Sequence, residues 1–406
     1  MTSSALDAAR PATASNIGLV SVFASTLFQL SGIFMMSPLL LLMLKKAGIS
    51  TTLAGLFAAT TWLGIFLITP FASTLTRWLG RRLAMWLASG APVLSGLGFL
   101  CSDTLWVWFA LQLLAGVAGG MRWVLAEAFI AEFSPPQHIG RAIGLYATMV
   151  GLTFIIGPAL LAWVGTDNDW GLWLAIGLMT LGLGWTAFIP RLPQDQDHHS
   201  ARVGLRGLWQ ATRAQPIIML AGFTGGFFEL GLASILPLYG LAVGLSAGAA
   251  AVLVSVSGLG GTLVALPVGM LADRFASPQQ GRRRMMTLCA ALIVLSTLLT
   301  PWAAHSLQLL WALVFVWGAS GAALYTLAMT DIGSRQKGMS LVNSTAVLVL
   351  AYTLGGLCAS SVCGALIDRS FTWGFPALLV SVAALALVCL LRTAGRAIPD
   401  DANEIA

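Results

Sequence analysis

The sequence predicts an all-α integral membrane protein with twelve transmembrane helices. Hydrophobic residues make up 58% of its 406 residues and charged residues only 9%, against about 25% charged in a typical soluble domain. A helix needs about 20 apolar residues to cross a hydrocarbon core about 30 Å thick. Twelve stretches of about this length or longer follow one another: Ile17–Leu44, Thr52–Thr76, Leu83–Ser102, Thr104–Phe133, Ala142–Thr166, Trp170–Pro190, Pro216–Val243, Leu245–Ala272, Met285–Ala304, Ser306–Thr330, Met339–Ile367 and Phe371–Leu391.

The positions of the basic residues give these spans a direction. Of the 21 Lys and Arg residues, seventeen fall on the side that holds both termini. Lys45, Lys46 and Arg369 fall on the other side, and Arg122 lies within a span. Cytoplasmic loops of membrane proteins are enriched in basic residues. We therefore expect a multi-pass protein of the inner (plasma) membrane with both termini in the cytoplasm. Contacts with lipid headgroups then explain the net charge of +6 without a nucleic-acid partner.

An internal repeat predicts two halves of six helices each. Three glycines of the fourth and fifth spans recur 198 residues later in the tenth and eleventh: Gly120, Gly140 and Gly157 against Gly318, Gly338 and Gly355. Such a repeat is typical of transporters whose halves are related by an axis along the membrane normal. We therefore predict one six-helix bundle over residues 1–190, a cytoplasmic linker over 191–215, which is the longest polar stretch, and a second, pseudo-symmetric bundle over 216–406.

A loop after the eighth span carries a known signature. It reads Gly-Met-Leu-Ala-Asp273-Arg274, followed by Gly281-Arg282-Arg283. This resembles the G-x-L-a-D-R-x-G-R-R loop of the major facilitator superfamily, which that family carries twice. The first-half copy keeps Gly-Arg-Arg at residues 80–82 but has Arg-Trp at 77–78 in place of Asp-Arg. The resemblance implies the superfamily fold, alternating access and a monomer.

Two further stretches extend the resemblance. Residues 140–146, Gly-Arg-Ala-Ile-Gly-Leu-Tyr, look like the family's entry to helix five, and Gly151 with Gly157-Pro158 is similar to its antiporter motif. The closing Gly-Gly of that motif is replaced by Leu-Leu. The resemblance implies a secondary transporter that exports a solute by proton antiport. Proton-coupled uptake of a small metabolite remains an alternative, as does a membrane sensor or assembly factor that keeps the fold without transporting.

Two acidic residues inside the spans are the expected proton-coupling groups. Glu229 follows the start of its span by thirteen residues, which is about 20 Å at 1.5 Å per residue and close to the bilayer centre. Glu127 lies in the fourth span. Carboxylates inside a membrane are costly and typically mark proton or ion pathways. Glu229 could also be satisfied by neighbouring helices without such a role.

Arg122 is the expected ligand for an anionic group of the substrate, or else the compensating charge for a carboxylate. It lies five residues from Glu127, about 140° around the helix, so the two are badly placed to pair directly. Other polar or aromatic residues within spans complete the predicted substrate site, although each could instead serve helix packing: Gln29, Trp123, Tyr325, Asn343 and Tyr352.

A conformational latch is expected at the cytoplasmic ends of the helices. The resemblance implies that Asp273 and Arg274 hold the cytoplasmic side closed, with Asp273 at a helix end and Arg274 on carboxylates. Arg141 at the start of the fifth span, with Glu132 and Asp331 at the ends of the fourth and tenth, are candidate partners.

Other chemistry is not indicated. No nucleotide-binding loop of the Walker type occurs, so ATP coupling within this chain is not expected. His198 and His199 have no third ligand nearby, and the five cysteines lack metal-ligand spacing. We expect no cofactor, no metal and no enzymatic activity. The few polar groups in the spans favour a small hydrophobic or amphipathic solute.

Overall fold

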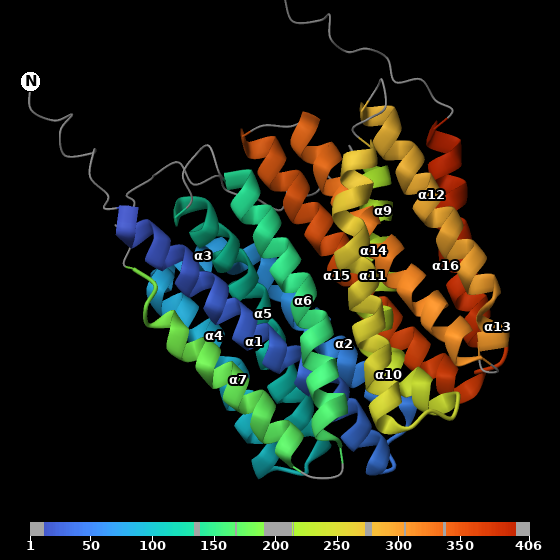
Figure 1. Ribbon diagram of the computed structural model, residues 1–406, viewed down its shortest axis with the longest axis horizontal. Coiled ribbons are helices and arrows are strands. Elements are labelled where there is room, and N and C mark those ends of the chain that lie inside the picture. The colour runs from blue at the N-terminus through green and yellow to red at the C-terminus, as the bar shows by residue number, and fades with distance from the viewer. Residues whose placement is uncertain are drawn as a thin grey trace, which may run out of the picture.

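A computed structural model describes residues 12–133, 139–166, 169–190, 213, 215–272, 278–303, 306–335 and 338–394. Within these ranges the chain forms helices and no strands. Figure 1 shows the helices of the first half, blue to green, beside those of the second half, yellow to red. The predicted linker, 191–215, falls almost entirely outside the described residues, so the predicted division at 190 and 216 stays a prediction.

The first half contains six long helices. In chain order they are α1 (Ala12–Lys46), α2 (Thr51–Ile68), α4 (Arg81–Cys101), α5 (Leu105–Phe133), α6 (Ile139–Val164) and α7 (Trp170–Thr186). Two short elements separate α2 from α4, namely η1 (Thr69–Phe71) and α3 (Ala72–Leu79). The predicted second span ran unbroken to Thr76. It is interrupted because Pro70 lacks the amide hydrogen that an α-helix needs at that position.

The second half also supplies six spans. The first is compound: α9 (Pro216–Gly226) continues through a π-helical turn, η3 (Phe227–Gly231), into α10 (Leu232–Ala242). The others are α11 (Ala247–Ala272), α12 (Pro278–Leu298), α14 (Leu307–Arg335), α15 (Gly338–Arg369) and α16 (Gly374–Ala394), with a short α13 (Thr300–Ala303) after α12.

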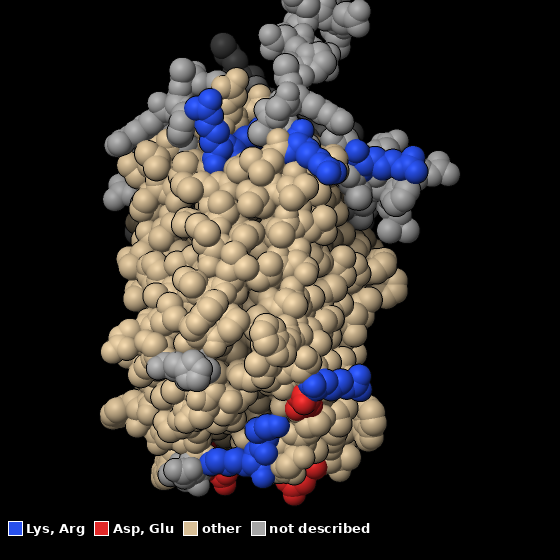
Figure 2. All heavy atoms as spheres, turned by 90° about the vertical axis from the view of Figure 1, so that its right-hand side faces the viewer, with Lys and Arg blue, Asp and Glu red and all other residues tan. Residues whose placement is uncertain are grey.

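Ten of these helical segments are long and apolar enough to cross a membrane. The remaining two spans are α7, which has 17 residues, and α12, whose first turns carry Arg282, Arg283 and Arg284. Together they make twelve. Figure 2 shows Lys, Arg, Asp and Glu at the two ends of the face drawn, with a broad uncharged belt between them. The chain is therefore a multi-pass membrane protein.

Helix packing repeats between the halves. A Cβ atom added at Gly120 of α5 would lie 2.6 Å from Ile68 of α2, and one at Gly318 of α14 would collide with Ser257 of α11. These two contacts join the fourth span to the second and the tenth span to the eighth. Gly157 meets α1 and Gly355 meets the α9–η3 segment in the same way, joining the fifth span to the first and the eleventh to the seventh. The glycine repeat thus marks equivalent close contacts in two six-helix bundles.

Candidate functional site

The two halves meet at the end of the molecule where α15 terminates, which we call the Asp368 end. The Asp368 carboxylate accepts hydrogen bonds from the backbone amides of Thr51 (2.9 Å) and Thr52 (2.5 Å) and from the Thr52 hydroxyl (2.8 Å). The first turn of α2 has free amide hydrogens and the positive end of the helix dipole, so a carboxylate there is favourable. An acid of the second half therefore caps a helix of the first.

From this end, contacts between the halves continue along two helix pairs. A Cβ atom added at Gly55 of α2 would lie 2.9 Å from the Cα atom of Gly364 of α15, so the two backbones touch. Between α6 and α11, the Ser255 hydroxyl donates a 3.0 Å hydrogen bond to the carbonyl of Ile155. Such close approach is what small residues permit between membrane helices.

An aromatic cluster occupies the middle of this interface. Trp62 of α2 packs with Leu230 of η3 and Tyr352 of α15, and its indole nitrogen donates a 3.2 Å hydrogen bond to Ser234 of α10. The partly buried rings of Trp123, Phe154 and Tyr325 pack against this group. Both halves therefore contribute aromatic rings to one contact region, which we call the aromatic cluster.

Glu229 borders the aromatic cluster from the second half. It lies in the π-helical turn η3, a feature often found at functional sites. Its carboxylate accepts a 2.5 Å hydrogen bond from the Tyr352 hydroxyl. Gly321 of α14 gives it room, because a Cβ atom there would lie 2.8 Å from the Cβ atom of Glu229. The side chain is only partly buried.

Glu127 borders the same cluster from the first half. The indole nitrogen of Trp123, one helical turn earlier, donates a 2.7 Å hydrogen bond to its carboxylate. Trp123 packs at the interface, so Glu127 lies on the face of α5 that looks towards the second half. Its side chain is exposed although it stands about 9 Å inside the end of α5.

Tyrosines link the two acids. Tyr325 lies within electrostatic range of both Glu127 and Glu229, and its ring centroid is 4.6 Å from that of Tyr352. Tyr146 of α6 lies within range of both Glu127 and Arg122 and is hydrogen-bonded to Thr26. The chain has only four tyrosines, and three of them surround these two carboxylates.

Arg122 lies elsewhere, inside the first half. Its guanidinium donates hydrogen bonds to the hydroxyls of Ser89, Ser25 (3.0 Å) and Thr26 (3.3 Å), and its side chain is only 3% exposed. The expected contact with substrate stays untested, but this packing among hydroxyls of α1 and α4 favours a structural role. Arg122 and Glu127 make no direct pair in the described contacts, in keeping with their spacing on α5.

Gln29 shares the surroundings of Arg122. It is fully buried and its amide nitrogen donates a 2.7 Å hydrogen bond to the carbonyl of Ser89, while its amide oxygen has no protein partner. Gln29 therefore lies within the first half and away from the aromatic cluster. Trp123, Tyr325 and Tyr352 do meet at that cluster, whereas the side chain of Asn343 lies outside the described residues.

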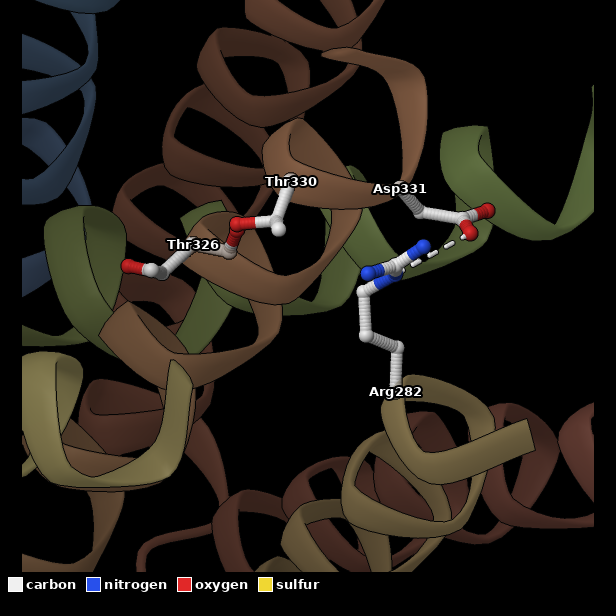
Figure 3. Close-up of polar contacts among 4 residues, drawn as sticks. All are labelled: Arg282, Thr326, Thr330 and Asp331. Carbon is white, nitrogen blue, oxygen red and sulfur yellow. Dashed lines mark hydrogen bonds and ion pairs between the residues drawn. The ribbon is translucent and has the colours of Figure 1, made fainter. Parts of the chain in front are cut away.

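The expected latch is described only in part. Asp273 and Arg274, and the side chains of Glu132 and Arg141, lie outside the described residues. Asp331 of α14 forms an ion pair with Arg282 of α12, with 3.4 Å between Oδ1 and Nε (Figure 3). Both residues belong to the second half, so this pair joins neighbouring helices of one bundle. We call this end of the molecule the Asp331 end.

Sequence reasoning missed three groups: Asp368 at the contact between the halves, Tyr146 near Glu127, and Ser89 beside Arg122. Asp368 carried a signal, since it follows an apolar span on the side with few charges. Tyr146 is one of four tyrosines in the chain, and Ser89 has no distinguishing pattern. Among the described residues there is no group of three His, Cys, Asp or Glu side chains that could hold a metal ion.

Comparison with known proteins identifies the family. The family model described as Major Facilitator Superfamily matches residues 22–342. The chain belongs to this superfamily. The resemblance carried by the loop signature is thereby confirmed, and with it the transporter fold of twelve helices in two bundles.

Curated relatives of this superfamily are distant. The chain is 26% identical over 367 residues to the uncharacterized MFS-type transporter YcaD of Escherichia coli O7:K1, a match that covers 89% of this chain and 92% of YcaD. It is 25% identical over 256 residues to the uncharacterized MFS-type transporter YfkF of Bacillus subtilis, covering 62% of this chain and 64% of YfkF.

Solved transporters share the fold. A D323A mutant of the nucleoside transporter NupG superposes with a TM-score of 0.76 at 12% identity, covering 94% of this chain and 100% of NupG. A POT family transporter in complex with a thioalcohol-conjugated peptide superposes with a TM-score of 0.73 at 14% identity, covering 93% and 95%. At these identities the likeness concerns the fold alone.

Proposed function

We propose that this superfamily member is a proton-coupled antiporter that exports a small hydrophobic or amphipathic solute from the cytoplasm. The observation that carries the proposal is the pair of carboxylates, Glu127 and Glu229, which face one aromatic cluster from opposite halves. Ionisable groups at membrane depth are expensive and typically serve transport. A group that binds and releases a proton between two moving halves couples the proton to their motion.

The arrangement of contacts supports alternating access. Among the described residues, contacts between the halves run from Asp368 along α2 and α15 as far as η1, and along α6 and α11. Glu127 lies at the aromatic cluster, on the Asp331 side of the Ser255–Ile155 hydrogen bond, and its side chain is exposed. The basic residues gather at the Asp331 end, so we place that end in the cytoplasm. We therefore propose that in this conformation Glu127 is open to the cytoplasm, while the hydrogen bonds of Asp368 close the opposite end.

Purified protein in liposomes that contain a pH-sensitive dye tests this function. Chloramphenicol, a neutral amphipathic solute, and tetraphenylphosphonium, a lipophilic cation, are added outside in separate runs. Antiport moves solute inwards and protons outwards, so the lumen should become alkaline with at least one of the two. Liposomes without protein give the rate of passive entry, and the exposed surface variant Asp103→Asn is the matched control.

Each alternative function predicts a different change in the signal of the pH-sensitive dye. Acidification of the lumen would indicate symport and would overturn the antiport proposal. No protein-dependent pH change with either solute, from protein that is folded and correctly inserted, would favour a non-transporting role.

A further inference from the structure

We infer that the solute is an organic cation with an aromatic or otherwise apolar body, bound between Glu127 and Glu229 and against the aromatic cluster. This inference rests on the proposed function and specifies its substrate. It depends on three features of the interface: the sign of the charges that face it, the position of Arg122, and the type of side chain that surrounds the acids.

Among the described residues, the charged groups that border the aromatic cluster are both acids. Glu229 receives a hydrogen bond from Tyr352 and Glu127 from Trp123, and both donors are neutral groups. Within the described ranges, Tyr325 and Tyr146 are further titratable groups near these acids, and both are neutral in their protonated form. The described contacts bring no Lys or Arg side chain to either carboxylate. A bound cation would supply the missing positive charge, whereas an anion would be repelled.

Arg122 does not cancel this charge. It is the one Lys or Arg in the sequence that lies far from the ends of its span. Its guanidinium is committed to Ser25, Thr26 and Ser89 inside the first half, and Tyr146 lies within range of both this guanidinium and Glu127. Arg122, which could have bound an anionic solute, is therefore hydrogen-bonded within the first half. It does not pair with Glu127 or Glu229 in the described contacts.

The aromatic cluster suits the same class of solute. Trp62 and Trp123 come from the first half, and Tyr325 and Tyr352 from the second. The faces of aromatic rings attract cations, by about 0.5–2 kcal/mol at each favourable contact, and Trp is the strongest of these rings. Partly buried rings also offer apolar surface to the body of a solute. Carboxylates with tryptophan and tyrosine are thus a suitable lining for an amphipathic cation.

A cation and a proton should compete for this site. Each neutralises Glu127 or Glu229, and the described groups of α5, α6, α14 and α15 that face these acids are the neutral Trp123, Tyr146, Tyr325 and Tyr352. The next described charged group is Arg122, which lies within range of Tyr146 and is hydrogen-bonded to hydroxyls of the first half. Acidic buffer should therefore weaken binding of the cation. This competition is what an exchange of one for the other across the membrane requires.

Binding of three matched ligands to the purified protein in lipid nanodiscs tests the inference without transport. Tetraphenylphosphonium is a cation, tetraphenylborate is its anion of the same shape, and triphenylphosphine oxide is a neutral analogue. We expect the cation to bind about tenfold or more tightly than the neutral analogue, since 1.4 kcal/mol of charge interaction gives a factor of ten. Tetraphenylborate should bind no better than it does to empty nanodiscs.

Single substitutions at the proposed site test which side chains contribute to binding of the cation. Glu229→Gln and Glu127→Gln should each remove most of the preference for the cation over the neutral analogue, and Asp103→Asn should not. Tyr325→Phe keeps the ring and should keep affinity, whereas Tyr325→Leu should lose about threefold to tenfold. Thermal unfolding of each variant without ligand separates loss of the site from loss of the fold.

Equal binding of the cation and the neutral analogue, or preferential binding of tetraphenylborate, would overturn the inference. So would cation binding that is unchanged in Glu229→Gln, Glu127→Gln and the double variant. Either outcome could coexist with dye-reported antiport of chloramphenicol, which would leave the proposed function standing with a different solute class.

Discussion

Arg122 and Glu229 are both charged residues deep within membrane spans, yet their surroundings differ in kind. Arg122 is 3% exposed and is surrounded by hydroxyl groups of its own half. Glu229 is partly exposed, lies in a π-helical turn, and borders the contact between the halves. A charge satisfied within one bundle moves with that bundle as a rigid part. A charge at the contact between bundles changes its environment when they move, so it is suited to coupling.

Replacing Glu229 should produce the largest effect on transport. Glu229→Gln keeps the size of the side chain and its acceptor for Tyr352 but cannot release a proton. Solute-driven pH change in liposomes should fall to the level of empty liposomes, while the thermal unfolding temperature stays close to that of the wild type. Proton movement at the wild-type rate would show that this acid is not the coupling group.

Replacing Arg122 should produce the opposite pattern. Arg122→Ala removes the donors for three buried hydroxyls and leaves a cavity in the first half, at a cost of about 2 kcal/mol or more. The unfolding temperature should fall, but transport per folded molecule should stay near the wild-type rate. Arg122→Lys should recover part of the stability, because one ammonium reaches fewer of these hydroxyls than a guanidinium fork. Normal stability with lost solute binding would restore the substrate role expected from the sequence.

Weakening the hydrogen bonds of Asp368 to the first turn of α2 should change the equilibrium between transporter conformations more than it changes the stability of the fold. Asp368→Asn loses the negative charge at the start of α2, which is worth about 1 kcal/mol. A cysteine placed at Ser360, buried between α2 and α15, should then react faster with a membrane-impermeant thiol reagent. The measurement uses a background without the native cysteines and Asp103→Asn as the control. An unchanged rate would mean that the cap does not hold this end closed.

The smallest effect is expected within the Arg122 surroundings. Ser89→Ala removes one hydroxyl acceptor, and Ser25 and Thr26 still hold the guanidinium. We expect a loss of about 1 kcal/mol in unfolding free energy, with unchanged solute-driven pH change. A transport defect without a stability defect would connect this group of residues to the transport cycle.

The fold was largely predictable because membrane spans depend on local composition. Each of the twelve predicted stretches overlaps a helical span, and the 198-residue glycine register corresponds to equivalent helix contacts. Boundaries set by charge or proline were less accurate. The predicted ninth span began at Met285, whereas α12 begins at Pro278, because a helix can extend its basic end beyond the apolar layer.

The surroundings of individual side chains were harder to predict. Spacing on α5 indicates that Arg122 and Glu127 face different ways, but it does not say which helix each one meets. A charge buried in a membrane span needs a partner, and the sequence does not show whether that partner is a set of hydroxyl groups or a bound ligand. For this reason Arg122 was expected near a substrate. Tyr352 and Glu229 are 123 residues apart, and their hydrogen bond depends on how α15 packs against η3. Only tertiary structure supplies that information.

The most direct test is to measure protons released when tetraphenylphosphonium binds to the detergent-purified protein in weakly buffered solution with a pH indicator. If a cation displaces protons from Glu127 and Glu229, proton release should rise in proportion to the cation bound, and it should be lost when both acids are replaced by glutamine. Saturable binding of the cation with no proton release from the wild-type protein, at any pH where binding occurs, would contradict the exchange.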